Sequence, residues 1–377
     1  MTRYPIDNHS SVTQTNLEAS GGELLARISD GVVHVTLNRP AKLNSLSYGM
    51  LGGLTDWLRA WAADDSVRAV VVRGAGEKAF CAGGDIRWLH DSYKAGNSEY
   101  ERYFEIEYTL DHLIHRYPKP YVAVMDGIVM GGGMGISQGA SLRVVSDRTR
   151  MAMPETGIGL IPDVGGSFFL SRLPGAIGPY LGLTGSTLNA ADSLYSGLAD
   201  LYLTPASLDH LAAAVTSAAR LPGAREAINA AMTALSASPE GCQLERLRPA
   251  IDAHFSLPSV QEIVQSLAAE DRTPYRDWAS ATLERLGKCS PLLLCVTLEQ
   301  LRRGRALNLS DCFRMELGLV NACLGQGDTL EGIRALIIDK DNQPRWNPAR
   351  IADVTSERVQ SFFHERWMPA GHPLVAL

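Results

Sequence analysis

The chain has 377 residues, of which 45% are hydrophobic and 20% are charged, so it can bury a full core as one large domain with an appendage or as two modest domains. Its net charge of −6 and pI near 5.9 argue against nucleic acid or an anionic membrane surface as the main partner, because binding either one needs concentrated Lys and Arg. The six cysteines form no Cys-x-x-Cys pair and have no spacing to His that suits zinc, so we predict reduced thiols and no metal site.

The N-terminal residues are polar and contain a single Arg. We predict a flexible tail over residues 1–21, because this composition fits neither a secretory signal nor an Arg-rich transit peptide. The best apolar run, around residues 121–136, is interrupted by Asp126, so no membrane span is predicted. A cytoplasmic location follows by elimination.

The first ordered elements predict a sheet. Two β-favouring runs, at residues 24–28 and 32–37, are joined by an Asp-Gly dipeptide at 30–31, which suits the positive φ angles of a tight hairpin. Ser47 is placed to cap a helix with apolar residues at helical spacing, and a Val-rich strand follows at residues 68–73. This alternation predicts a parallel or mixed sheet.

Two glycine-rich turns follow short strands. Gly83 and Gly84 precede Asp85, which is placed to cap a helix, and a second run at residues 130–136 contains three successive glycines at a helix start. Both turns expose backbone N–H groups that could bind a ligand. Taken alone, each is explained as well by an ordinary turn or by close helix packing.

Three functional explanations compete for the second run. It fails as a dinucleotide fingerprint, because Ile136 stands where a Gly or Ala is needed. Residues 135–139 match Gly-x-Ser-x-Gly around Ser137, but about ten residues of loop separate them from the preceding strand, where a serine hydrolase has a tight turn. The third explanation is an oxyanion hole, for which Gly84 could supply the second donor.

The helix predicted over residues 99–117 carries an acid in its apolar stripe. Tyr103, Leu110 and Ile114 belong to this stripe, and Glu107 occupies a position where packing predicts a hydrophobic residue. Burying an unpaired carboxylate is costly, so Glu107 lies at the edge of the stripe, is paired, or faces a site. The pattern by itself favours the edge.

Residues 151–166 place two acids, Glu155 and Asp163, in an apolar segment rich in Gly and Pro. We interpret this segment as the wall of an active site. The alternative is a pair of exposed turn acids that cap short helices. Residues 22–206 are predicted to form the sheet-based core, and residues 207–377 a helical region with clear helix starts at 290–291 and 310–311.

Several of these segments, in this order, resemble the crotonase (enoyl-CoA hydratase/isomerase) superfamily, and within it the 3-hydroxyisobutyryl-CoA hydrolases. The resemblance spans roughly residues 22–365. The motifs are Phe-Cys-Ala-Gly-Gly-Asp-Ile-Arg (80–87), Met-Gly-Gly-Gly (130–133), Met-Pro-Glu-Thr-Gly-Ile-Gly-Leu (153–160), Pro-Asp-Val-Gly-Gly (162–166) and Asp-Lys-Asp (339–341).

This resemblance implies an α/β fold, a crotonase-type spiral of repeated ββα units with an α-helical C-terminal extension. It also implies an acyl-CoA substrate whose thioester carbonyl oxygen meets the backbone N–H groups of Gly84 and Gly132. Glu155 matches the superfamily's catalytic glutamate, Asp163 the acid of the hydrolase branch, and Glu107 a glutamate of its substrate site.

The resemblance also narrows the chemistry. Hydratases of the superfamily carry a further glutamate at the position of Gly135, and its absence here argues against hydration by two acids. The function implied is acyl-CoA thioester hydrolysis, with 3-hydroxyisobutyryl-CoA as substrate in valine degradation and with no metal or redox cofactor. Relatives often assemble through trimers, so a homo-oligomer is an open expectation. The alternatives are an enoyl-CoA hydratase or isomerase, a serine hydrolase using Ser137, and a non-catalytic acyl-CoA-binding protein.

Overall fold

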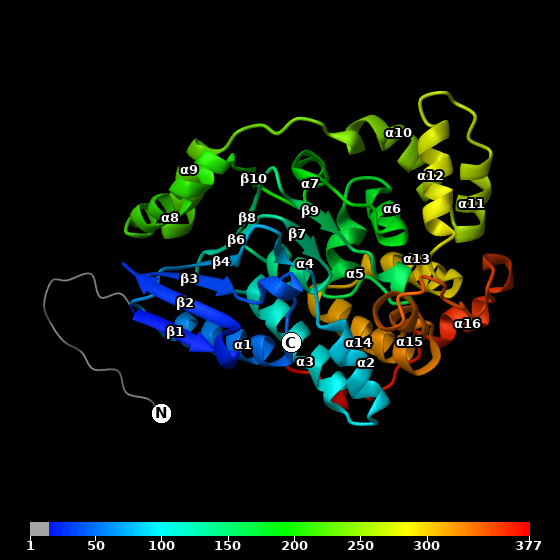
Figure 1. The fold of residues 1–377 in the computed structure, drawn as a ribbon, viewed down its shortest axis with the longest axis horizontal. Helices are drawn as coiled ribbons and strands as arrows, with labels where there is room; N and C mark the ends of the chain where they lie inside the picture. Colours follow the sequence, from blue (N-terminus) through cyan, green and yellow to red (C-terminus); the bar gives the residue numbers. More distant parts are fainter. Residues whose placement is uncertain (1–14) are drawn as a thin grey trace, which may run out of the picture.

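The computed structural model describes residues 15–377 (Figure 1). Two sheets form the centre of the N-terminal half. The strands are β1 (Thr15–Ala19), β2 (Leu24–Ser29), β3 (Val32–Leu37), β4 (Ala69–Gly74), β5 (Ala79–Cys81), β6 (Tyr121–Met125), β7 (Ile128–Met130), β8 (Leu142–Val145), β9 (Arg150–Ala152) and β10 (Leu201–Tyr202).

Successive strand pairs contribute one strand to each sheet. The larger sheet has the order β1-β2-β3-β4-β6-β8-β10, antiparallel from β1 to β3 and parallel from β3 onward. The smaller sheet, β5-β7-β9, is entirely parallel. The chain thus winds through β4 and β5, then β6 and β7, then β8 and β9, with helices between the pairs. This confirms the predicted spiral of repeated ββα units.

Local signals set the first elements as predicted. β2 and β3 pair antiparallel across a turn in which Asp30 and Gly31 have φ angles of 54° and 77°. Helix α1 (Tyr48–Ala63) begins after Ser47, whose hydroxyl accepts the backbone N–H of Met50. The predicted hairpin and helix cap are confirmed.

The predicted tail over residues 1–21 is wrong for its last part. Residues 1–14 lie outside the described residues, but Thr15–Ala19 form strand β1, paired with β2 at the edge of the larger sheet. Leu17 and Ala19 pack against the core while Glu18 between them is exposed. Such alternation of buried and exposed residues is typical of a β-strand, but the prediction of a tail relied on the polar composition of the segment.

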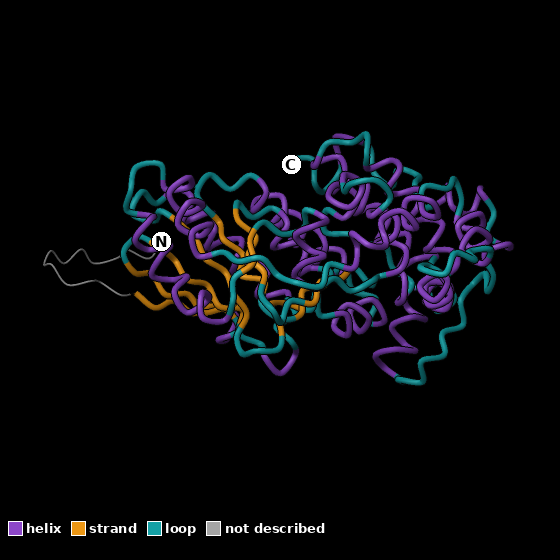
Figure 2. The backbone as a smooth tube through the Cα atoms, turned by 90° about the horizontal axis from the view of Figure 1, so that it is seen from above, coloured by secondary structure: helices purple, strands orange, loops and turns teal. Residues whose placement is uncertain are grey.

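Helices cover both faces of the larger sheet (Figures 1 and 2). Val71 and Val122 contribute to an apolar layer shared with α8 (Pro205–Ala219) and α9 (Ala224–Leu235), whereas their neighbours Val70 and Tyr121 point into the main core. The remaining helices are α2 (Ile86–Lys94), α3 (Glu99–His115), α4 (Gly132–Gln138), α5 (Gly166–Phe169), α6 (Ile177–Thr184), α7 (Ala190–Ser196), α10 (Gln243–Phe255), α11 (Val260–Ala268), α12 (Arg276–Leu286), α13 (Pro291–Gly304), α14 (Leu309–Gln326), α15 (Thr329–Ile333) and α16 (Ser356–Ser361).

The C-terminal helices divide into two groups. α8 and α9 complete the layer over the larger sheet, while α10 to α16 pack away from it, in the half of the molecule that Figure 2 shows as almost entirely helical. Helix α13 begins at Pro291 behind the predicted cap Ser290, but α14 is capped by Asn308, before the predicted start at 310–311. Both α13 and α14 contact α5, which directly follows the Asp163 turn.

Candidate active site

The ends of three parallel strands bring the candidate site together. Gly83 and Gly84 follow β5, Gly131 and Gly132 follow β7, and Glu155 follows β9. Because these strands are neighbours in one parallel sheet, the segments that leave their carboxyl ends lie side by side. The sequence motifs are therefore adjacent in space although they are spread over some 70 residues of the chain, from Gly83 to Glu155.

The two glycine turns lie against helix α3, so a side chain on Gly84 or Gly132 would displace a side chain of that helix. A Cβ atom on Gly132 would lie 2.5 Å from Glu107 Oε1 and 3.5 Å from Gly84 N, and one on Gly84 would lie 2.7 Å from the Tyr103 hydroxyl. Within residues 15–377, neither the Gly84 N–H nor the Gly132 N–H donates to an acceptor. Both amides are free to bind a ligand.

A cavity of about 180 Å³ lies between these turns and the candidate acids. Its polar wall carries the three predicted acids, Glu107, Glu155 and Asp163. Its apolar wall comes mainly from α2, α3 and the segment after β9, through Ile86, Leu89, Phe104, Ile158 and Leu160. The structure thus joins every site residue inferred from the sequence in one cavity.

Glu107 is deeply buried, with an exposed fraction of 3%, so the expected place at the edge of the stripe is wrong. The apolar stripe of α3 faces the cavity, so its buried side chains surround Glu107. Burial, with the negative charges of Asp163 and Glu155, raises its pKa well above the usual value. Burial and the nearby Asp163 also raise the pKa of Glu155 well above the usual value, and Glu155 Oε2 has no hydrogen-bond partner among the described residues.

Asp163 differs from these two acids because it has a direct donor. The Tyr108 hydroxyl donates to Asp163 Oδ2 at 2.6 Å. Burial raises the pKa of Asp163 to about 6, while the bond from Tyr108 acts in the opposite direction. Asp163 is therefore the acid of this cavity whose surroundings best support ionisation at neutral pH.

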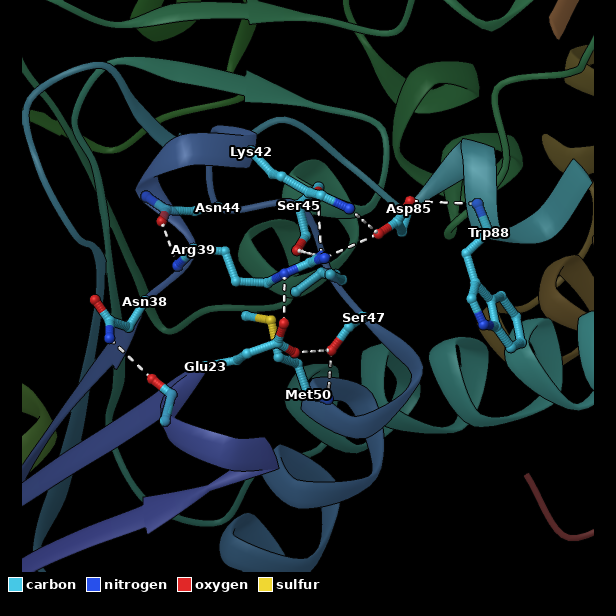
Figure 3. A network of polar contacts seen from close by, with 12 residues as sticks. Glu23, Asn38, Arg39, Lys42, Asn44, Ser45, Ser47, Met50, Asp85 and Trp88 are labelled. Carbon is cyan, nitrogen blue, oxygen red and sulfur yellow. Dashed lines mark hydrogen bonds and ion pairs between the residues drawn. The ribbon is translucent and has the colours of Figure 1, made fainter. Parts of the chain in front are cut away.

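A polar network surrounds Asp85, the residue that follows Gly84 (Figure 3). Asp85 caps α2 by accepting the Trp88 N–H, as predicted, and also pairs with Arg39 at 2.9 Å and with Lys42 at 3.3 Å. Arg39 in turn pairs with Glu23 at 2.8 Å. The network fixes the residue that follows Gly84, while the Gly84 amide itself is oriented by the Leu46 N–H, which donates to the Gly83 carbonyl of the same peptide at 2.8 Å.

Three buried groups near the site were missed by sequence reasoning. They are Tyr108, the donor to Asp163; Asp111, one turn after Glu107, whose carboxyl oxygens have no partner among the described residues; and Glu316, whose carboxylate accepts two backbone N–H groups beside Asp163. For Glu316 a signal existed, because it occupies the apolar stripe of α14 just as Glu107 does in α3. Its partners could not be inferred, since they lie about 150 residues earlier in the chain.

Comparison with known proteins assigns the chain to a family. Residues 32–363 match the family described as enoyl-CoA hydratase/isomerase. The chain belongs to the enoyl-CoA hydratase/isomerase family. The predicted resemblance is thus confirmed over most of the chain.

Individual relatives match nearly the whole chain. The chicken (Gallus gallus) protein named "3-hydroxyisobutyryl-CoA hydrolase, mitochondrial" is 41% identical over 349 residues, covering 91% of this chain and 89% of the relative. "Small ribosomal subunit protein mS47" of Neurospora crassa is 40% identical over 339 residues, covering 85% and 66%. A crystal structure described as a carnitinyl-CoA dehydratase from Mycobacterium thermoresistibile has a TM-score of 0.83 and 41% identity, covering 90% of this chain and 96% of that one.

The expected cytoplasmic location is contradicted by these comparisons. The chicken relative is named as a mitochondrial protein, so the cytoplasmic expectation is withdrawn. The expectation rested on elimination alone. No property of the described residues indicates a location, so the name of the chicken relative outweighs the cytoplasmic expectation.

The structure also decides two features of this family member that the sequence left open. Ser137 lies inside α4 and is fully buried, and its hydroxyl donates to the Gly133 carbonyl at 2.8 Å, so it is not arranged as a nucleophile. A Cβ atom on Gly135 would lie 2.6 Å from Asp111 Oδ2 and 2.8 Å from Val164 Cβ. A side chain has no room at position 135.

The described residues provide neither a metal-binding cluster nor a membrane-spanning helix. Within residues 15–377, no group of three His, Cys, Asp or Glu side chains is arranged to hold a metal ion. In the same part of the chain, no helix combines the length and the apolar character needed to cross a membrane.

Proposed function

We propose that the protein hydrolyses an acyl-CoA thioester, and that its substrate is 3-hydroxyisobutyryl-CoA. The observation that carries this proposal is the single cavity in which two free backbone amides, Gly84 and Gly132, lie together with Glu155 and Asp163. Thioester hydrolysis needs these two elements, donors for the carbonyl oxygen and acids that handle water and the leaving thiol. The named chicken hydrolase, 41% identical, supports the choice of substrate.

The two amides would bind the thioester carbonyl oxygen. As water or a carboxylate adds to the carbonyl carbon, negative charge develops on this oxygen, and fixed N–H donors in a cavity that excludes water stabilise that charge. The peptide that carries the Gly84 N–H is held by the bond from the Leu46 N–H to the Gly83 carbonyl, and Gly132 is held at the start of α4. The donors therefore need little reorganisation during the reaction.

The environments of the two acids suggest how protons are shared. In the empty cavity, burial favours a proton on Glu155, whereas the Tyr108 hydroxyl supports a charge on Asp163. Transfer of that proton to Asp163 leaves an ionised Glu155 and a neutral Asp163. This is the arrangement in which Glu155 can act as a base and Asp163 as an acid.

Every proton transferred in this route is accounted for. Glu155 removes one proton from water as the oxygen attacks the carbonyl carbon, the carbon–sulfur bond breaks, and Asp163 gives its proton to the departing thiolate. The products are a carboxylic acid and the CoA thiol, and the proton is again on Glu155. In the alternative route Glu155 attacks the carbonyl carbon itself and water then hydrolyses the mixed anhydride, which hydroxylamine would trap.

Glu107 would contact the hydroxyl of the acyl group. Its Oε1 has no partner among the described residues and lies beside Gly132, so a substrate hydroxyl near the second amide could pair with it. The apolar wall formed by Ile86, Leu89 and Phe104 suits a methyl branch. No residue of the proposed reaction calls for a metal or a redox cofactor. Valine degradation is the pathway in which we place this substrate.

The first experiment is thiol release from a panel of short branched and hydroxylated acyl-CoAs. Glu155→Gln and Asp163→Asn are expected to lower kcat by about 10²- to 10⁴-fold, the usual range for a general acid or base. Glu284→Gln, which replaces an exposed acid of α12, is the control and should leave the rate unchanged. Normal thiol release by both folded cavity variants would contradict the roles proposed for Glu155 and Asp163, and no thiol release by the unaltered protein would contradict the proposed function.

A second candidate is an enoyl-CoA hydratase or isomerase of the same fold, favoured by the similarity to the structure described as a carnitinyl-CoA dehydratase. The lack of space for a side chain at Gly135 argues against it, because the resemblance places the second hydratase acid there. Crotonyl-CoA separates the two. Loss of the enoyl absorbance without free thiol would indicate hydration.

The third candidate is a non-catalytic acyl-CoA-binding protein, for which the similarity to protein mS47 of Neurospora crassa is the supporting observation. Tight binding of CoA esters with no turnover across the panel would favour that role. Sedimentation measured in the same preparation would test the expected homo-oligomer.

A further inference from the structure

The turn that carries Asp163 has a strained backbone. Val164 and Gly165 have φ angles of 51° and 87°, so two successive residues adopt the left-handed conformation. A β-branched residue such as Val164 rarely does so, and the conformation persists only where the surroundings hold it. The direction of the Asp163 side chain therefore depends on the groups that fix the residues after it.

Glu316 of α14 supplies this restraint. Its Oε2 accepts the backbone N–H of Gly165 and its Oε1 accepts the backbone N–H of Ser167, each at 2.7 Å. The side chain is completely buried, so water does not compete for these bonds. One carboxyl group thus bridges the end of the strained turn and the first turn of α5.

The neighbouring helix holds the other end of the same turn. Gln300 of α13 donates to the Pro162 carbonyl at 2.7 Å and to the Ser167 hydroxyl at 2.8 Å. On α14 the Phe313 ring, one turn before Glu316, lies 5.6 Å from the ring of Tyr108, which donates to Asp163. The C-terminal helices therefore set both the turn that carries Asp163 and the ring that orients its carboxyl group.

We propose that Glu316 is a positioning residue that aims Asp163 at the cavity by accepting two N–H groups of the turn that follows it. This inference rests on the proposed role of Asp163 in thioester hydrolysis. It gives the C-terminal helices a part in the reaction although Glu316 does not line the cavity. The oxyanion amides and Glu107 come from other segments, so loss of Glu316 should spare substrate binding.

The test is a double-mutant cycle of Glu316→Gln and Asp163→Asn, with kcat and KM measured for thiol release from 3-hydroxyisobutyryl-CoA. The amide of the replacement can accept only one of the two N–H groups and turns a donor toward the other. We expect kcat to fall about 10- to 100-fold with KM nearly unchanged, since a small misplacement of a reacting group costs up to about 10²-fold. In the Asp163→Asn background Glu316→Gln should have almost no further effect.

Asp311→Asn is the matched control, because Asp311 lies on the same helix with a side chain that is 43% exposed. Folding is checked by circular dichroism and by the melting temperature, and rates are expressed per folded molecule. If Glu316→Gln does not fold, the same cycle is run with Glu316→Asp, which keeps the carboxyl group but shortens the reach by one methylene.

The outcomes are distinct. An unchanged kcat in a folded Glu316 variant overturns the inference, and so does an equal loss in both backgrounds, which would show that Glu316 acts on the fold and not through Asp163. Normal turnover by Asp163→Asn alone would instead refute the role proposed for Asp163, and no thiol release by the unaltered protein would refute the proposed function. A strongly impaired Asp163→Asn together with a normal Glu316→Gln would refute only the positioning role.

Discussion

Asp163→Asn should make the folded protein more stable at neutral pH although it removes a proposed catalytic acid. Burial raises the pKa of Asp163 from 3.8 to about 6, so the folded chain holds this proton more tightly than the unfolded chain does. The stabilising effect of the neutral form is complete below pH 3.8 and is lost as the pH rises through about 6. Above that pH a buried charge must be maintained.

The magnitude follows from the two pKa values. The interval from 3.8 to about 6 corresponds to about 3 kcal/mol at pH 7 and to roughly half of that at pH 5. The substitution removes this cost, because an amide does not ionise. Its oxygen can still accept the Tyr108 hydroxyl, so packing and hydrogen bonding change little.

The assay is urea unfolding of both proteins at pH 5 and pH 7. We expect the gain in free energy of unfolding to be larger at pH 7 by about 1 kcal/mol or more. Asp311→Asn, on the exposed side of α14, should change it by less than about 0.5 kcal/mol at either pH. A loss of stability at pH 7, or a gain that does not depend on pH, would show that burial of a charged Asp163 is not the cause.

Three other substitutions probe the cavity. Activity needs an ionised Asp163 in the free enzyme, so the acid limb of the pH profile of kcat/KM is expected near pH 6. Tyr108→Phe removes the donor that lowers the pKa of Asp163 and should move this limb to higher pH. An unmoved limb would assign it to another of the acids that face Asp163, namely Glu107, Asp111, Glu155 or Glu316. Gly132→Ala should raise KM and abolish most activity, because its Cβ would lie 2.5 Å from Glu107 Oε1, and normal kinetics would show that the carbonyl does not bind there. Glu107→Gln should lower the rate of thiol release from hydroxylated acyl-CoAs by about 10-fold or more and leave the rate for branched acyl-CoAs without a hydroxyl unchanged. Equal losses of rate for both classes would contradict the contact between Glu107 and the substrate hydroxyl.

The sequence by itself determined the first hairpin, two helix caps and the candidate residues. The Asp-Gly turn after β2 and the helix caps Ser47 and Asp85 depend on local chemistry, and each lies where the sequence placed it. The glycine turns and the acids after them were found for the same reason, since an acid or a run of glycines in an apolar segment is visible without any long-range contact.

Only the tertiary structure decided what these residues do to one another. Glu107 was expected at the edge of its stripe, and its burial became visible once α3 was packed beside the strand ends of the smaller sheet. The bonds from Gly165 and Ser167 to Glu316 join residues 151 and 149 positions apart, and no periodicity or spacing encodes such a pairing. The pKa of a buried acid depends on all charges and donors around it, so the sharing of protons between Glu155 and Asp163 follows from packing and not from the order of residues.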